Sequence, residues 1–259
     1  MKRTLKVVAD KRFITSLEYI CLRLVGQASW VNSGSLSEIE DGVCEVVCRS
    51  DEDISCFLDV LSDVIVNDCK AYFIKKSIQL ANVDEVGRYV FVRTLCAFDY
   101  ETDKIIAEDL ILKAEIFSGK NKSFLLGSFY DFCLDILKKR WSEVCMLTNE
   151  NISCLACKCN FDELLKFMIA NVESRCHEVF LVERGNGVEV LDKSLQKIGG
   201  VYVDPNLSNE VQVLETLITL APRKIVFLGE DCKLFDRVRN LFADNCVTVT
   251  SDIMPKIIL

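Results

Sequence analysis

The sequence predicts an α/β (or α+β) protein, and changes in hydrophobic periodicity along the chain carry this prediction. A short alternating segment over 4–9 precedes a helical pattern over 13–25. Beyond about residue 50, apolar residues recur at spacings of three and four, which is typical of amphipathic helices. Beyond about residue 175 the period changes to two, which is typical of half-buried strands. We therefore expect a small α/β unit at 1–50, a helical region at 51–175 and a C-terminal α/β domain at 176–259.

The first two regions carry the less regular patterns. A β-α-β unit is expected at the start, with one or two strands between the first helix and Arg49. Asp51 is expected to cap the next helix, because acidic side chains complement the first helical turn. Residues 100–122 are compatible with either a short helix or a hairpin around 118–121. Residues 149–151 (Asn-Glu-Asn) predict a turn between two helices of the middle layer.

A β-hairpin is the clearest local structure expected in the C-terminal domain. Val179–Glu183 and Val188–Leu191 alternate in hydrophobicity and flank an Asn-Gly pair, which is the strongest short-range signal for a hairpin. A short strand is expected at 201–203. The stretch from 210 to 252 then predicts helix, buried strand, helix and strand.

Within that last stretch the turn residues are easily recognised. Pro222 ends a helix, and Ile225–Leu228 is apolar on both faces, as a central strand should be. Asp231 is expected to cap the helix that follows. The order strand-helix-strand predicts a parallel pair joined by a right-handed crossover. The C-terminal domain is therefore expected to be a hairpin followed by a β-α-β-α-β arrangement with a parallel strand pair.

The composition is that of a globular protein with a full hydrophobic core. Half of the residues are hydrophobic, 27% are charged, and the formal net charge is −8. Because an acidic surface repels phosphate backbones, we expect no nucleic-acid partner. No apolar run approaches the roughly 18 residues that span a bilayer, and Asp10-Lys11-Arg12 interrupts the N-terminus before a signal peptide could form. We expect a cytoplasmic protein with no membrane span, and leave its oligomeric state open.

The chain is rich in cysteine, with fourteen residues scattered along it. Most stand where a small hydrophobic residue would, for example Cys133 and Cys145 on one apolar helical stripe, so we expect reduced core thiols. Cys154, Cys157 and Cys159 are candidates for a metal or redox site. They lack the second cysteine pair that a tetrahedral zinc site usually has. A cysteine-rich helix face is therefore the favoured interpretation, and no cofactor is expected.

Recognised signals for catalysis are absent from the sequence. His177 is the only histidine, whereas nucleophilic triads need a base that a third group orients. There is no G-x-S-x-G elbow, and no glycine-rich phosphate loop stands between a strand and a helix. We therefore expect a non-enzymatic protein with no catalytic residues.

One location nevertheless suits a ligand, because open α/β sheets bind ligands outside the carboxyl ends of their parallel strands. This rule selects six residues: Gly229, Glu230, Asp231, Thr250, Ser251 and Asp252. The acidic side chains there suit a divalent cation, although helix capping is the favoured explanation for them. A small-ligand or divalent-metal-binding regulator or enzyme is thus the alternative function.

Several segments near the C-terminus carry a family resemblance. Glu215–Gly229 reads ETLITLAPRKIVFLG and is followed by RNLF at Arg239–Phe242 and VTV at Val247–Val249. Phe161–Ile169 and the end of the hairpin, Val190-Leu191-Asp192, fit as well. Together they resemble the C-terminal signature of the YtxC-like family, which is associated by name with sporulation in Firmicutes. The middle helix of that family opens with basic residues among aromatics, whereas 124–132 contains none here.

The resemblance implies a structural signature without catalytic residues, because none are assigned to the family. Our leading hypothesis is a non-enzymatic, cytoplasmic protein of the YtxC-like type that acts through contacts with a protein partner.

Overall fold

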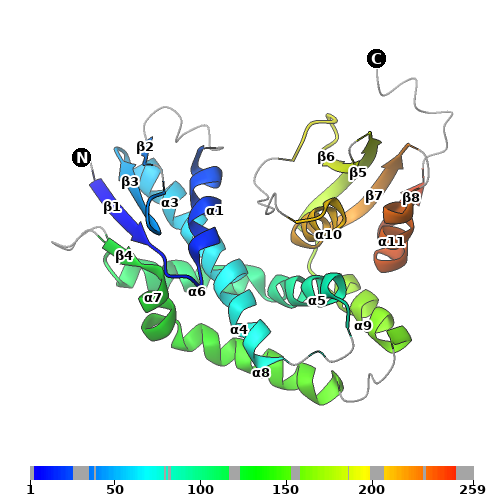
Figure 1. The fold of residues 1–259 in the computed structure, drawn as a ribbon, viewed down its shortest axis with the longest axis horizontal. Coiled ribbons are helices and arrows are strands. Elements are labelled where there is room, and N and C mark those ends of the chain that lie inside the picture. Colours follow the sequence, from blue (N-terminus) through cyan, green and yellow to red (C-terminus); the bar gives the residue numbers. More distant parts are fainter. Residues whose placement is uncertain are drawn as a thin grey trace. The chain divides into compact units, whose positions relative to one another are not determined.

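The computed structural model describes residues 3–25, 35–37, 39–78, 80, 83–116, 123–152, 158–185, 187–198, 207–229 and 232–248. The chain divides into two compact units, each described here by itself. The first unit is Met1–Gln79 with Asp99–Glu150, and the second unit is Leu80–Phe98 with Asn151–Leu259. Both contain a sheet and helices (Figure 1). The α/β fold class is therefore confirmed.

The sheet of the first unit has the strand order β2-β3-β1-β4 among the described residues. Its strands are β1 (Arg3–Val8), β2 (Ser35–Leu36), β3 (Val43–Cys48) and β4 (Ser123–Leu125). β1 pairs antiparallel with β3 and parallel with β4. Leu5, Val7, Cys44, Val46 and Cys48 are fully buried, because alternate side chains of β1 and β3 point into the core. The expected N-terminal strand-helix-strand unit is present, with its two main strands antiparallel.

Two helices of the first unit begin or end differently from the sequence prediction. Helix α1 (Ile14–Val25) agrees with it, but α3 (Asp51–Val64) is capped by Ser50. The Ser50 hydroxyl accepts a hydrogen bond from the Asp53 amide and the Asp53 carboxylate accepts one from the Ser50 amide, so a capping box replaces the expected Asp51 cap. Helix α8 (Asp135–Ile152) continues through 149–151, where we wrongly predicted a turn.

The other helices of the first unit between residues 65 and 133 include the region whose sequence pattern was ambiguous. Five residues in π-helical conformation (Ile65–Cys69) connect α3 to α4 (Lys70–Ser77). Of the ambiguous region 100–122, helix α6 (Tyr100–Lys113) forms the greater part, and residues 118–121, where a hairpin was the alternative, lie outside the described residues. Helix α7 (Leu126–Cys133) follows β4 directly. Cys145 is buried as expected, but Cys133 is exposed, so these two cysteines do not share one buried stripe.

A buried ion pair joins α4, α6 and α8 in the core of the first unit. The Lys70 ammonium donates to Asp103 Oδ2 at 2.8 Å, and both side chains are almost fully buried. The indole N–H of Trp141 donates to the same oxygen at 2.9 Å, while Arg140 Nε donates to Asp103 Oδ1 at 3.0 Å. A buried carboxylate is stable when cations and donors surround it in this way.

The sheet of the second unit has the order β6-β5-β7-β8 among the described residues. Its strands are β5 (Cys176–Arg184), β6 (Gly187–Leu191), β7 (Pro222–Leu228) and β8 (Cys246–Thr248). β5 and β6 form the predicted antiparallel hairpin, and β7 pairs parallel with both β5 and β8. The predicted parallel pair is therefore confirmed. The strand expected at 201–203 lies outside the described residues.

Among its described residues, the second unit contains four packed helices: α5 (Glu85–Ala97), α9 (Lys158–Ala170), α10 (Asn209–Leu220) and α11 (Lys233–Leu241). Ala221 takes a left-handed conformation between α10 and β7, with φ of 39°. The N-cap of α11 is Cys232, which makes no side-chain capping bond, instead of the expected Asp231. None of the helices in the described residues combines the length and the apolar composition needed to cross a membrane.

The two units do not coincide with the ranges 1–50, 51–175 and 176–259, because α5 packs against α10. Arg93 of α5 lies 2.8 Å from the buried Glu215 carboxylate of α10. Arg175 donates to the carbonyls of Thr219 and Ala97 at 3.1 Å each. Residues 80–98 therefore belong to the second unit although the residues on either side of them, 1–79 and 99–150, belong to the first.

Replacing Asp103 should destabilise the chain strongly. Asp103→Ala removes the carboxylate that neutralises the buried Lys70 ammonium. We expect the free energy of unfolding to fall by about 3–5 kcal/mol, the usual effect of breaking a buried ion pair. Urea unfolding followed by tryptophan fluorescence measures this change, because Trp141 contacts Asp103 directly.

The matched control is Asp109→Ala on the same helix, α6. Asp109 is exposed and pairs with Lys113 one turn away, so its loss should cost less than about 0.5 kcal/mol. Equal effects of the two substitutions would contradict the role given to the buried pair.

Candidate functional site

The ligand site predicted from the sequence falls largely outside the described residues. Gly229 is the one member of the six that is described, and it directly follows β7 with a φ of +126°. A Cβ atom added there would lie 3.4 Å from Cβ of Glu183 on the neighbouring strand β5. Glu230, Asp231, Thr250, Ser251 and Asp252 lie outside the described residues, so this site stays a prediction.

The candidate metal site formed by Cys154, Cys157 and Cys159 also stays a prediction. Cys154 and Cys157 lie outside the described residues, and Cys159 is described only as part of the α9 backbone. In the part of the chain that the structure does describe, no group of three or more His, Cys, Asp or Glu side chains is placed to hold a metal ion. His177 is exposed on β5.

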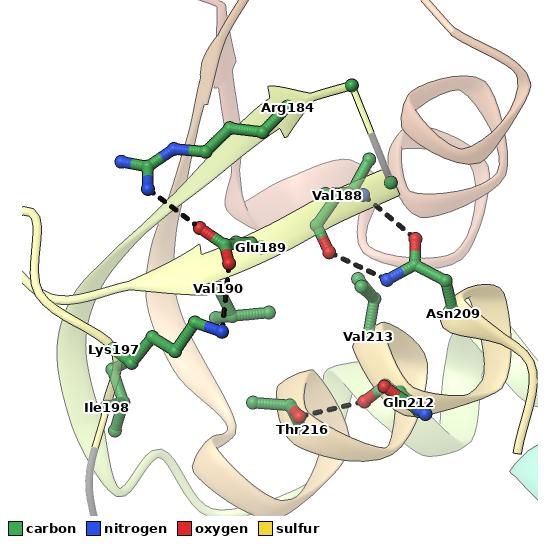
Figure 2. Close-up of a pocket in the computed structure, with 12 residues that line it drawn as sticks. Arg184, Val188, Glu189, Val190, Lys197, Ile198, Asn209, Gln212, Val213 and Thr216 are labelled. Carbon is green, nitrogen blue, oxygen red and sulfur yellow. Dashed lines mark hydrogen bonds and ion pairs between the residues drawn. The ribbon is translucent and has the colours of Figure 1, made fainter. Parts of the chain in front are cut away.

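The structure brings a different set of residues together, in a groove between β6 and α10 of the second unit (Figure 2). The groove has a volume of about 520 Å³. One wall is the edge strand β6 with the segment at Lys197–Ile198, and the other is one face of α10. That face consists of Asn209, Gln212, Val213 and Thr216, whose spacing of three and four places them side by side over two turns. We refer to this feature as the β6–α10 groove.

The side chain of Asn209 closes one end of the groove by binding to the backbone of β6. Its Oδ1 accepts a hydrogen bond from the Val188 amide at 2.8 Å, and its Nδ2 donates to the Val188 carbonyl at 2.9 Å (Figure 2). The amide thus makes the two bonds that a neighbouring strand would make. An edge strand otherwise presents these groups unpaired.

Gly187 allows this close approach of Asn209 to the strand. Its φ is +138°, which side chains of L-residues rarely adopt, and an added Cβ would lie 2.6 Å from Asn209 Oδ1. Beyond the other end of β6, the chain turns back and Leu191 forms a bridge with Lys197. The Asp192 carboxylate supports that turn by accepting bonds from the amides of Ser194 and Gln196.

Two cations and one carboxylate line the mouth of the groove. Glu189 projects from β6 between Arg184 Nη1, at 3.1 Å, and Lys197 Nζ, at 2.9 Å (Figure 2). The side chains of Arg184 and Lys197 are 60% and 78% exposed, whereas that of Glu189 is 27% exposed. The cations therefore face solvent and outnumber the acid by one, which gives this rim a local positive charge on an acidic chain.

The interior of the groove is a mixture of apolar and hydrogen-bonding groups. Val190, Ile198 and Val213 supply the apolar surface. The Thr216 hydroxyl donates to the Gln212 carbonyl at 2.8 Å, and Gln212 Nε2 donates to the Leu207 carbonyl at 2.8 Å. Most ligand pockets combine an apolar lining with a few placed polar groups in this way. The arrangement can bind and orient a ligand.

A second polar cluster lies at the carboxyl ends of the parallel strands β1 and β4 in the first unit. Arg12 donates to both oxygens of Asp10, at 3.0 and 3.1 Å, and to both oxygens of Asp131, at 2.7 and 2.9 Å. These hydrogen bonds from Arg12 hold the pKa of Asp10 and the pKa of Asp131 below their usual values. Because the guanidinium and the two carboxylates satisfy each other, we interpret this cluster as a structural link between the β1–α1 loop and α7.

Comparison with protein-family models, curated proteins and solved structures finds no match to this chain.

Sequence reasoning missed the β6–α10 groove because no motif marks its residues. The hairpin that contains Arg184, Gly187 and Glu189 was predicted, and α10 was predicted to begin near Asn209. The signal that was available is the glycine of the Asn-Gly pair, since a positive φ often accompanies a close approach of another group. That signal does not reveal which group approaches.

Gly187→Ala should weaken the two hydrogen bonds between Asn209 and the Val188 backbone, which we call the Asn209 clasp, because the added methyl carbon would lie only 2.6 Å from Asn209 Oδ1. We expect the free energy of unfolding to fall by about 1–3 kcal/mol and the Val188 amide to exchange faster with solvent. NMR-detected hydrogen exchange at Val188 measures this effect.

Gly185→Ala is the control, because nothing lies within 4 Å of a Cβ at that position. Its effect should stay within about 0.5 kcal/mol, with exchange at Val188 unchanged. Unchanged exchange at Val188 in Gly187→Ala would show that the clasp does not protect this amide.

Proposed function

We propose that this chain is a non-enzymatic binding protein whose β6–α10 groove holds an extended, acidic segment of a partner protein. The observation that carries the proposal is a groove with apolar and hydrogen-bonding groups in its interior and two exposed cations at its mouth. Contacts with a protein partner would then be the molecular role of the chain.

The shape of the groove suits an extended chain. Its volume of about 520 Å³ lies within the range of about 300–1,000 Å³ that is usual for ligand pockets. Asn209 and Thr216 mark its length along α10, which is about 10 Å at 1.5 Å per residue. An extended segment rises about 3.3 Å per residue, so about three residues fit along this wall.

The hydrogen-bonding pattern favours recognition through side chains over addition of a strand to the sheet. Strand addition needs free backbone groups at a sheet edge. Asn209 already occupies the amide and the carbonyl of Val188, and the turn after Leu191 bridges back to the end of β6. A bound segment would therefore lie in the groove, with apolar side chains against Val190 and Val213.

The charges favour an acidic segment. Arg184 and Lys197 are both exposed and share a single carboxylate, Glu189. A carboxylate of the partner can approach either cation from solvent. Electrostatic complementarity of this kind contributes to specificity and to the rate of association.

The wider assignment rests on the family resemblance and on composition. The resemblance of Glu215–Gly229 to the YtxC-like signature supports a sporulation protein of Firmicutes, and Glu215 and Thr216 of that segment belong to α10, which forms the groove wall. The net charge of −8 supports a protein partner over nucleic acid, and a cytoplasmic location stays part of the proposal.

Lys197→Glu should weaken binding of acidic peptides. Peptides selected from a random library on the wild-type chain should be enriched in Asp and Glu next to apolar residues. We expect their Kd to rise about tenfold or more in Lys197→Glu, since about 1.4 kcal/mol corresponds to each factor of ten. Isothermal titration calorimetry measures the change.

Two further variants separate the groove from general charge effects. Lys193→Glu makes the same charge change at an exposed position outside the groove lining, and should alter Kd by no more than about twofold. Thr216→Trp fills the groove without changing its charge and should abolish binding. An equal rise in the peptide Kd in Lys193→Glu and Lys197→Glu, or unchanged peptide binding by Thr216→Trp, would contradict the proposal.

A further inference from the structure

Two cysteines of the first unit have their sulfur atoms in direct contact. Cys21 lies on α1 and Cys44 on β3, and their Sγ atoms are 3.3 Å apart. At this distance one S–H group points at the other sulfur. A disulfide needs a separation of about 2.05 Å, so the sulfurs would have to approach by little more than 1 Å.

The two thiols differ in their access to solvent. Cys44 is fully buried, because it points from β3 into the core with Val46 and Cys48. Cys21, within α1, is partly exposed. A dissolved oxidant can therefore reach the sulfur of Cys21 and not that of Cys44.

The environment of Cys44 also favours its thiolate. The hydrogen bond from the Cys21 thiol lowers the pKa of Cys44 below its usual value, and the same interaction raises the pKa of Cys21. For Cys48, on the same strand, burial instead raises the pKa to about 12. Thiolates are the reactive form of cysteine, so the contact distinguishes Cys44 from an inert core thiol.

We propose that Cys21 and Cys44 are a redox pair that low-molecular-weight disulfides convert reversibly into a Cys21–Cys44 disulfide. Cys21 passes its proton to the neighbouring Cys44 thiolate, 3.3 Å away, as it attacks one sulfur of the oxidant, which forms a mixed disulfide and releases the first small thiol. Cys44 then attacks Sγ of Cys21 and releases the second. The two protein thiols lose two electrons and two protons, and the oxidant takes up both as it becomes two thiols.

This assignment goes beyond the proposed binding function, which concerns the second unit. The disulfide would link α1 covalently to the sheet of the first unit. Since a cross-link restricts the unfolded chain, the oxidised form should unfold at a higher temperature than the reduced form.

Peptide mapping of the full chain after equilibration with reduced and oxidised glutathione tests the proposal. In the wild type we expect a Cys21–Cys44 peptide that dithiothreitol removes. In Cys44→Ser the reaction should stop at the first step and leave glutathione on Cys21. In Cys21→Ser the buried Cys44 should remain a thiol.

Cys48→Ser is the matched control, because Cys48 is equally buried on the same strand, and it should form the disulfide as the wild type does. The exposed Cys133 reports that the oxidant is active. The proposal is overturned if wild-type Cys21 and Cys44 stay reduced at every glutathione ratio while Cys133 becomes modified, or if either pairs with a different cysteine. The wild-type map decides this even where a variant fails to fold.

Discussion

The pair of hydrogen bonds between the Asn209 amide and the Val188 backbone is the interaction on which the candidate site depends. A strand at the edge of a sheet carries unpaired amides and carbonyls, which invite another strand. Asn209 satisfies both groups of Val188 from the first turn of a helix. The bonds therefore pair the edge of β6 at Val188 and connect β6 to the first turn of α10.

Helix α10 is also held on its other side. Glu215 is nearly buried and lies 2.8 Å from Arg93 of α5, and Ser208 caps the helix by accepting a bond from the Val211 amide. Because the helix is fixed at its start and along its buried face, the polar face at Gln212 and Thr216 has a rigid support. Sites built on such supported elements hold their geometry more accurately than sites on loops.

The fold was largely predictable from the sequence because its signals are local. The Asn-Gly pair specifies the β5–β6 hairpin, and the apolar run at Ile225–Leu228 specifies a central strand with parallel neighbours. The errors arose where a competing local interaction prevailed. Ser50 and not Asp51 caps α3, because the Asp53 side chain completes a capping box. Helix α8 continues through 149–151, since a helix tolerates exposed polar side chains such as those of Asn149 and Glu150.

The candidate site was less predictable, because its contacts join residues that are distant in the sequence. Asn209 and Val188 are twenty-one positions apart, and neither residue type by itself predicts that the two will form hydrogen bonds with each other. The same holds for Lys70 with Asp103 and for Cys21 with Cys44, whose partners become neighbours only when the elements pack. Periodicity predicts which face of an element is buried, whereas the partner across the interface depends on register and packing.

Hydrogen exchange of the full chain with and without a selected acidic peptide tests the central claim most directly. If the peptide lies in the β6–α10 groove, exchange should slow at β6, at Lys197–Ile198 and in the first two turns of α10, and stay unchanged in the first unit. Slower exchange confined to other elements, or none at all with a peptide that binds, would contradict the account.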